Sequence, residues 1–321
     1  MADATDLSSP ADLPPERHEL LAKIASLYYE ANQTQAEIAD RFGISRSSVS
    51  RLLGEARETG VVNISIRWPR NITGDVTAQL VAAFPRTEVH VVRAAGRGYP
   101  QVVEALGAVA TSLLEDKLAD DDILGISWNT GVYQVVGAFR AARKLGVTVI
   151  QLTGSTGVSN PVIDGPDLAR WLAQVLGGQY LYIPAPLVVD SRATRDALLA
   201  DRTIAERLEV AYRCNIALVG IGTVFPPLCN LYQMGYLTDE QLHKITQAGA
   251  VGELLSYFYD IDGRVLPLPL HKRIVGLPIS RLPDIDTVIG VAAGKEQGAA
   301  VLGALRGGYV SCVVIDDEAA A

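Results

Sequence analysis

Cysteine is scarce in this chain of 321 residues, which has three cysteines and no C-x-x-C pair. Cys214, Cys229 and Cys312 are far apart and odd in number, so their pattern indicates neither a zinc motif nor a redox motif. We expect buried thiols in a reducing compartment.

Long apolar segments are also absent. No uninterrupted apolar run reaches the roughly 18 residues that a membrane span needs. The first 17 residues, MADATDLSSPADLPPER, lack the apolar core of a secretory signal. These two absences predict a cytoplasmic protein without a membrane partner.

An excess of basic residues is missing as well. The chain has 28 Lys and Arg against 36 Asp and Glu, a formal net charge of -8 and a pI near 5.1. Bulk charge therefore does not favour a protein that coats nucleic acid or an anionic membrane. Any contact with DNA has to be local.

The composition is that of a folded chain with a large core. Hydrophobic residues make up 49% and charged residues 20% of the sequence, which argues against disorder and fibrous classes. The length fits two domains, or one long α/β domain with a small module. Residues 1–16, with Pro10, Pro14 and Pro15 among small polar residues, predict a loose tail.

Three short helices are predicted before residue 61. Apolar residues recur at helical spacing over 20–28 and 35–42, Gly43 interrupts the second run, and Ser45 is a suitable N-cap for a third helix that ends before Gly60. The alternating β-branched residues 61–67 predict a strand. We place a helix-turn-helix domain at residues 17–66 and a linker at 67–75.

Residues 76–321 predict a larger α/β domain with a doubly wound, mostly parallel sheet. Apolar strand-like runs alternate with amphipathic or Ala-rich segments, as buried parallel strands alternate with covering helices. The runs are EVHVVR, DILGIS, VTVIQLTG, QYLYIPAP, NIALVGIG, DTVIGVAAG and YVSCVVID. In open sheets of this kind, ligands bind just outside the carboxyl ends of the strands.

The segment QAEIADRFGISRSSVSRLLG, residues 35–54, has the spacing of a helix-turn-helix. Ala39 is small enough for a helix crossing, Gly43 suits a left-handed turn, and we expect the apolar positions Ile38, Ile44, Val49 and Leu52 to point inward. The second helix would then present short polar and arginine side chains to the major groove of double-stranded operator DNA. The candidate DNA-binding residues are Thr34, Gln35, Arg46, Ser47, Ser48, Ser50 and Arg51.

An ordinary helical hairpin with a solvated face is the alternative to this DNA-binding interpretation. Residues 34–60 contain four arginines and four acidic residues, so their local net charge is zero. This balance implies weak non-specific binding, with affinity recovered by oligomerisation.

Residues 125–131, GISWNTG, predict the most informative loop of the large domain. The loop ends a strand and opens a helix, so free N–H groups and the side chains of Ser127, Asn129 and Thr130, with Gly131, could meet an anion or a polyol. A helix cap with an incidentally polar loop is the alternative.

Several segments resemble chemical motifs but lack a residue or a spacing that the motif requires. Gly220 and Gly222 follow a strand, but Phe225 stands where a dinucleotide motif needs its third glycine. Gly294 and Lys295 lack the spacing of a phosphate-binding loop. The four histidines have no neighbouring ligands at metal spacing, and residues 316–318, DDE, are typical of a solvated surface. We therefore expect no metal and no cofactor.

The run LYYEANQTQAEIADRFGISRSSVSRLLGEARETGVVNISI resembles the N-terminal domain of the SorC family of sugar-responsive bacterial transcription regulators, sometimes grouped near DeoR regulators. Ordered blocks such as ILGISWNTGV, VIQLTGSTG, NIALVGIGT and AGAVGELLSYFYDIDG extend the resemblance over roughly residues 20–320. It implies a sugar-binding domain related in fold to ribose-5-phosphate isomerase and glucosamine-6-phosphate deaminase, and usually a homotetramer. It also implies effector contacts from Gln151, Gly154, Ser155, Gly222, Glu253 and Arg273, although Glu253 and Arg273 could equally lie at the surface.

Departures from the family pattern suggest what the effector is. Asn129 occupies a family glycine, and Gln297 replaces a family lysine that would neutralise a phosphate, with Lys295 two residues away. Amides suit hydroxyl groups better than a dianion. We predict a neutral sugar or sugar alcohol, with a sugar phosphate as the alternative effector. The rival to a regulator is an isomerase- or deaminase-like enzyme, but fold does not transfer chemistry.

Overall fold

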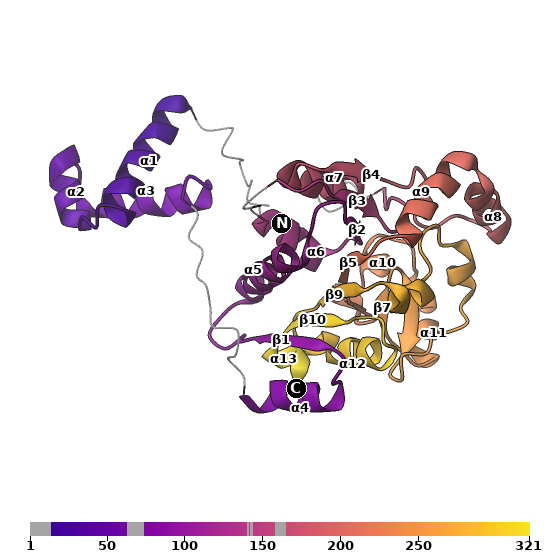
Figure 1. The fold of residues 1–321 in the computed structure, drawn as a ribbon. Coiled ribbons are helices and arrows are strands. Elements are labelled where there is room, and N and C mark those ends of the chain that lie inside the picture. The colour runs from indigo at the N-terminus through magenta and orange to yellow at the C-terminus, as the bar shows by residue number, and fades with distance from the viewer. Residues whose placement is uncertain (1–13, 63–73, 140, 142–143, 158–164) are drawn as a thin grey trace. The chain divides into compact units, whose positions relative to one another are not determined.

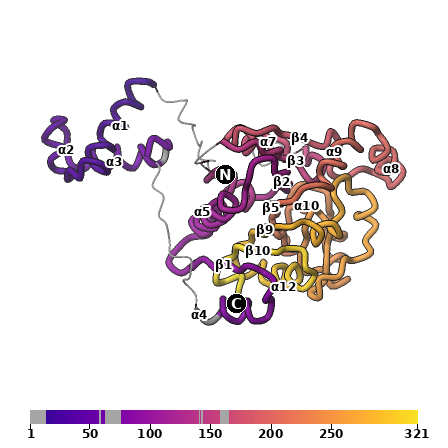
Figure 2. Tube along the Cα trace, in the orientation of Figure 1, coloured from indigo at the N-terminus to yellow at the C-terminus, as the bar shows by residue number. Residues whose placement is uncertain are grey.

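The chain forms two compact units, residues 1–69 and 70–321. A computed structural model describes residues 14–62, 74–139, 141, 144–157 and 165–321, and Figures 1 and 2 trace the chain through both units. The predicted strand at 61–67 and linker at 67–75 lie mostly outside the described residues, as does most of the predicted tail. Val61 and Val62, which are described, form a bend rather than a strand.

The described part of the N-terminal unit contains helices joined by short turns, and no strand (Figure 1). Its helices are α1 Pro15–Tyr29, α2 Gln35–Phe42 and α3 Arg46–Glu58. Helix α1 begins two residues before the predicted start at Arg17, because a proline fits the first helical position. Gly43 ends α2 with a left-handed φ of 64°, as predicted, and Ser45 caps α3 by accepting a hydrogen bond from the Ser48 N–H.

A small apolar core holds the three helices together, and it includes Ile38, Ala39, Val49 and Leu52 as predicted. The prediction for Ile44 is wrong, since 36% of this residue is exposed. Ile44 belongs to the turn after α2, where its N–H donates to the Ala39 carbonyl, and it is not part of the core cluster of the three helices.

The C-terminal unit is built on a seven-stranded sheet whose strand order is β1-β10-β9-β5-β2-β3-β4, with every pair parallel. All seven predicted strands are present, which confirms the mostly parallel α/β class. The bounds are β1 Glu88–Val92, β2 Ile123–Ile126, β3 Thr148–Gln151, β4 Gln179–Leu181, β5 Ile216–Gly220, β9 Thr287–Val291 and β10 Cys312–Asp316.

Helices cover both faces of this sheet, as a doubly wound fold requires. One layer consists of α5 Tyr99–Lys117, α6 Thr130–Ala138 and α7 Gly165–Leu176, which pack side by side over the strands. The opposite layer includes α4 Gly74–Ala83, α9 Arg202–Tyr212, α12 Gly298–Arg306 and α13 Asp317–Ala320. The remaining helices are α8 Arg192–Ala200, α10 Asn230–Gln233, α11 Asp239–Gln247 and the 3-10 turns η3 Pro226–Leu228, η4 Pro269–Arg273, η5 Ile279–Asp284 and η6 Lys295–Gln297.

A second, antiparallel sheet was not predicted. It has the order β6-β7-β8, from Gly222–Thr223, Ala250–Leu254 and Tyr257–Asp260. The turn between β7 and β8 uses Leu255 and Ser256 at φ values of 51° and 70°, where hairpins usually place Asn or Gly. Without those residues, LLSYFY gives no turn signal.

No helix in the described part of the chain combines the length and the apolar character needed to cross a membrane.

Candidate functional site

The exposed face of α3 carries the predicted DNA-binding side chains. Arg46, Ser47, Ser50 and Arg51 are all exposed, whereas Val49 between them is fully buried and anchors the helix. Ser48 is only half exposed, and its hydroxyl group lies 2.8 Å from the Ser45 hydroxyl at the helix cap. Ser48 therefore serves the cap. The Ser47 hydroxyl group also lies 2.8 Å from the Ser45 hydroxyl, so Ser47 is exposed but belongs to the same group of hydroxyls.

The start of α2 is less suited to a phosphate than we predicted. The Thr34 N–H and hydroxyl group both donate to the Glu37 carboxylate at 2.8 Å. The bond from the Thr34 backbone is the main reason that the pKa of Glu37 is lowered. A negative charge thus stands where Thr34 and half-exposed Gln35 would meet a DNA phosphate.

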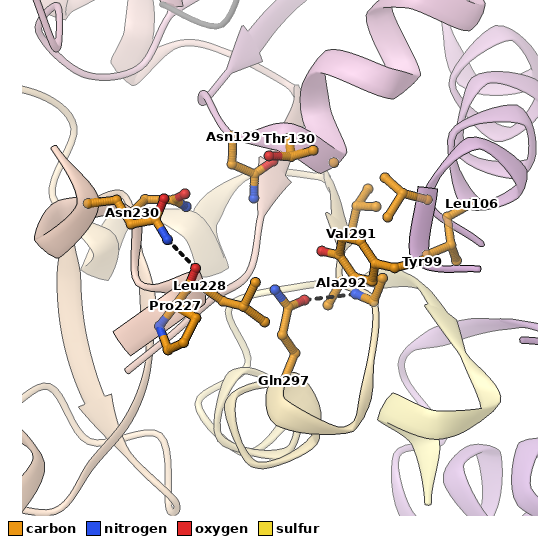
Figure 3. A pocket seen from close by; sticks show the side chains of 14 residues that line it. Tyr99, Leu106, Asn129, Thr130, Pro227, Leu228, Asn230, Val291, Ala292 and Gln297 are labelled. Atoms are coloured by element: carbon orange, nitrogen blue, oxygen red, sulfur yellow. Dashed lines mark hydrogen bonds between the residues drawn. The ribbon is translucent and has the colours of Figure 1, made fainter. Parts of the chain in front are cut away.

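A pocket of about 110 Å³ opens at the carboxyl ends of β2 and β9, where ligands bind in open α/β sheets (Figure 3). Four segments far apart in the sequence supply its walls: the start of α5, the loop from β2 into α6, the region of η3 and α10, and the loop from β9 into η6. The lining residues are Tyr99, Val103, Leu106, Asn129, Thr130, Gly131, Pro227, Leu228, Asn230, Gln233, Val291, Ala292, Ala293 and Gln297.

Asn129 is held firmly at one wall. Its Oδ1 accepts from the Val132 N–H at 2.8 Å and so caps α6, while the residue is only 8% exposed. Gly220 makes room for this side chain, because a Cβ at position 220 would lie 1.6 Å from Asn129 Nδ2. Ser127 is buried beneath the wall, where its Oγ accepts from the Gly220 N–H at 3.0 Å.

Gln297 forms the facing wall. Its Oε1 accepts from the Ala293 N–H at 2.7 Å, and its amide nitrogen points into the space below Asn129 (Figure 3). Lys295 is exposed and does not line the pocket. Of the predicted effector contacts, the structure therefore brings together Asn129, Thr130, Gly131 and Gln297.

The other predicted effector contacts do not line this pocket, and they are Ser127, Gln151, Gly154, Ser155, Gly222, Glu253, Arg273 and Lys295. Gln151 is fully buried at the end of β3, and neither polar atom of its side chain has a hydrogen-bond partner. Gly154 is tight against the carbonyls of Ala185 and Pro186. Arg273 is half-buried, and its carbonyl accepts from the Val189 N–H.

Glu253 is buried in the second sheet rather than facing solvent. Its Oε2 accepts from the Ser256 N–H at 2.9 Å, and burial raises its pKa to about 7. Gly222 lies opposite on β6, where a Cβ would come within 2.3 Å of Glu253 Oε1.

Two expectations about polar clusters are wrong at particular residues, although Glu318 is exposed as predicted. Asp316 is 1% exposed rather than part of a solvated surface, because its carboxylate accepts from the Gly294 and Ala319 N–H groups. His90 does have neighbouring ligand atoms: Glu88 lies two residues before it on the same face of β1, and Cys312 on β10 completes the group.

Three polar residues of the lining, Tyr99, Asn230 and Gln233, were not predicted from the sequence. The Gln233 amide donates to the Pro227 carbonyl and ties α10 to η3. The pKa of Tyr99 is raised, first by burial and then by the carboxylates of Asp316 and Glu296. None of these residues stands in a motif, so only the folded chain reveals them.

The fold and the pocket define a helix-turn-helix protein with a ligand-binding α/β domain, and comparison with known proteins agrees. A family model described as "Putative sugar-binding domain" matches residues 71–321, and one described as "Sigma-70, region 4" matches residues 13–59. The chain belongs to the family of the putative sugar-binding domain. The predicted membership of the SorC family is confirmed.

The relatives are transcription regulators. The deoxyribonucleoside regulator of Bacillus subtilis (strain 168) is 29% identical over 95% of this chain and 97% of its own length. The sorbitol operon regulator of Klebsiella pneumoniae is 28% identical over 94% of this chain and 96% of its own. The crystal structure of the full-length sorbitol operon regulator SorC superposes with a TM-score of 0.74 and 27% identity, covering 96% of this chain and 98% of that one.

These findings decide between the two classes that the sequence left open. The protein is a DNA-binding transcription regulator with a sugar-binding domain, and it is not an isomerase or deaminase.

Proposed function

We propose that the pocket at the carboxyl ends of β2 and β9 binds a neutral sugar or sugar alcohol, and that its occupancy changes how strongly α3 binds operator DNA. This proposal rests on the kinds of side chain that line the pocket. Four of its side chains are amides, and none of the lining residues is Lys, Arg or His; the amides are Asn129, Asn230, Gln233 and Gln297. An amide offers both a donor and an acceptor, which matches a hydroxyl group.

A sugar phosphate is the alternative effector, and one feature favours it. Helix α6 begins at the pocket, and the N-terminus of a helix attracts an anion. Against this stand the Asp316 and Glu296 carboxylates, which act on Tyr99 of the lining. A phosphate dianion would meet these negative charges without a lysine or arginine in the lining to balance them.

Calorimetry on matched pairs, each a sugar or sugar alcohol with its phosphorylated form, tests the effector class. We expect the neutral member of a pair to bind at least as tightly. If the phosphorylated member binds tenfold tighter, a difference of about 1.4 kcal/mol, the neutral-effector proposal is wrong.

Two variants sharpen this test. Gln297→Lys should shift the preference toward the phosphorylated member, because it places a cation in the lining. Lys295→Gln should leave the preference unchanged, since Lys295 is exposed and outside the lining.

For the DNA-binding unit, we propose that Arg46, Ser47, Ser50 and Arg51 contact the operator. Arg51→Ala should weaken operator binding by about 1–3 kcal/mol and reduce its salt dependence, while leaving effector binding intact. The matched control is Arg192→Ala, which removes another exposed arginine, from α8 in the other unit. Operator affinity that is the same in both variants would contradict this assignment of α3.

We also propose a cytoplasmic homotetramer that reads a palindromic operator. The zero net charge of residues 34–60 supports this proposal, because a single unit with so little excess charge binds DNA weakly. To act as a switch, the effector needs a differential affinity of about 1–3 kcal/mol between DNA-competent and DNA-incompetent forms. Analytical ultracentrifugation with and without operator DNA measures the assembly.

A further inference from the structure

Outside the pocket and the α3 face, the most distinctive polar group is a cluster of Glu88, His90 and Cys312. One ligand atom of each residue lies within 4.8 Å of the other two, and His90 Nε2 is 2.8 Å from Glu88 Oε1. We propose that these three side chains form a binding site for Zn²⁺ or a similar borderline-soft divalent cation.

The sheet itself places the three residues. Glu88 and Cys312 are register partners on the parallel pair β1 and β10, and His90 is two residues further along β1. Residues two apart on a strand point to the same face. The ligand atoms therefore come from adjacent positions of a hydrogen-bonded ladder, so a metal would find its ligands already gathered.

The donor set matches the chemistry of zinc. Zn²⁺ binds thiolate, imidazole and carboxylate at about 2.0–2.3 Å in tetrahedral geometry, so its ligand atoms lie roughly 3.5 Å apart. The observed separations, from 2.8 Å to at most 4.8 Å, bracket that value. Three protein ligands leave the fourth position to a water molecule, as in zinc sites that stay open.

Exposure and charge are both compatible with metal entry. Cys312 is buried, while the side chains of His90 and Glu88 are 13% and 44% exposed, so the cluster reaches from the interior to solvent. Burial raises the pKa of the Cys312 thiol to about 12, so a divalent cation would displace this proton to solvent on binding. The resulting thiolate and the Glu88 carboxylate would neutralise the cation. Lys117 of α5 donates to Glu88 Oε2 at 2.8 Å, which leaves Oε1 facing His90 and fixes the orientation of the carboxylate, as outer partners of metal ligands do.

The position of the cluster separates it from the sugar pocket. Glu88 and Cys312 are the first residues of their strands, whereas the pocket lies at the carboxyl ends of the same sheet. Strand β1 is an edge strand whose hydrogen-bonded neighbour in the sheet is β10. A metal bridging the two would add a second link between them.

The test uses the full-length protein, reduced and freed of metal with a chelator. Titration with Co²⁺ should give one equivalent of binding and a near-ultraviolet thiolate-to-cobalt charge-transfer band, and Zn²⁺ should displace the cobalt. Cys312→Ala should abolish the band, while His90→Gln and Glu88→Gln should each weaken Co²⁺ binding at least tenfold. Cys214→Ala, another buried cysteine, and His243→Gln, an exposed histidine, are the matched controls and should behave as the unmutated protein.

A second measurement protects the test against a variant that does not fold. Because a ligand that binds the folded state raises stability, Zn²⁺ should raise the melting temperature of the unmutated protein, and the rise should disappear in His90→Gln. The proposal is overturned by the absence of a charge-transfer band in the unmutated protein. A band that survives Cys312→Ala, or an increase in melting temperature that survives His90→Gln, would overturn it equally.

Discussion

Glu37 in the N-terminal unit and Glu253 in the C-terminal unit hold the same carboxyl group in opposite surroundings. Glu37 is exposed, and the Thr34 N–H lowers its pKa. Glu253 is buried, and loss of water raises its pKa to about 7. The two candidate sites show the same contrast: the side chains proposed to contact DNA are exposed on α3, whereas Asn129 and Gln297 of the pocket lining are buried.

The largest expected effect is on stability, and it comes from replacing the buried carboxyl group of Glu253. Its pKa is higher in the folded state than its ordinary value of 4.5, so the folded state binds the proton more tightly. Stability contributed by this group is complete below about pH 4.5 and is lost as the pH rises through about 7, by roughly 3 kcal/mol in all. Glu253→Gln should remove this loss and stabilise the C-terminal unit at pH 8.

Urea denaturation at pH 5 and pH 8 measures this difference. Glu318→Gln removes an exposed carboxyl from the same unit and should leave the pH dependence in place. Glu37 should act in the opposite sense, because a lowered pKa gives stability that is lost as the pH falls. If Glu253→Gln keeps the pH dependence of the unmutated protein, the burial of Glu253 is not the cause of the loss of stability at high pH.

The next effect concerns a glycine that the pocket requires. In Gly220→Ala the new methyl group would overlap Asn129 Nδ2, at 1.6 Å, so the Asn129 amide has to leave its place as the cap of α6. Overpacking of this kind costs about 1–3 kcal/mol, and effector binding should weaken with it. Melting curves and effector calorimetry on the same variant measure both losses.

Removing a helix cap should cost about 1 kcal/mol of stability in each unit. Ser45→Ala and Asn129→Ala both remove the side chain that accepts from the first turn of a helix. Hydrogen exchange should speed up at the Ser48 amide in one variant and at the Val132 amide in the other. Only Asn129→Ala should also weaken effector binding, and an equal loss in Ser45→Ala would contradict the division of roles.

The smallest effect has the opposite sign. Gly54 lies inside α3 with nothing within 4 Å of a Cβ built there, and alanine is about 0.5–1 kcal/mol better than glycine within a helix. Gly54→Ala should therefore raise the melting temperature of the N-terminal unit. The same replacement of glycine by alanine is therefore expected to raise stability at position 54, where there is open space, and to lower it at position 220, where the pocket wall is packed.

Much of the fold could be predicted because each large-domain strand of the main sheet is a short apolar run beside a helical segment. The β7–β8 hairpin could not, since Leu255 and Ser256 adopt positive φ without the residues that usually announce such a turn. The burial of individual polar side chains was harder to predict than the hairpin. The burial of Asp316 depends on the Gly294 N–H from a loop 22 residues earlier in the chain.

The residues that line the candidate pocket also fall into two groups, those that could be predicted from the sequence and those that could not. Asn129, Thr130 and Gly131 could be predicted because one loop follows one strand, and a strand-to-helix loop has recognisable residues. Tyr99 comes from the start of α5, and Asn230 and Gln233 both come from α10. Their convergence depends on strand order, which the sequence pattern does not specify.

The pairing of β1 with β10 also has a consequence for how the chain is made. The contacts of α1, α2 and α3 are local in sequence, whereas β1 waits for a strand that begins 224 residues after it, at Cys312. Distant pairings form slowly, and domains fold as units while the chain emerges from the ribosome. During synthesis there is accordingly an interval in which the DNA-reading helices are complete and the sensor is not. Nascent chains arrested before Cys312 should carry a folded α3 and an unpaired β1.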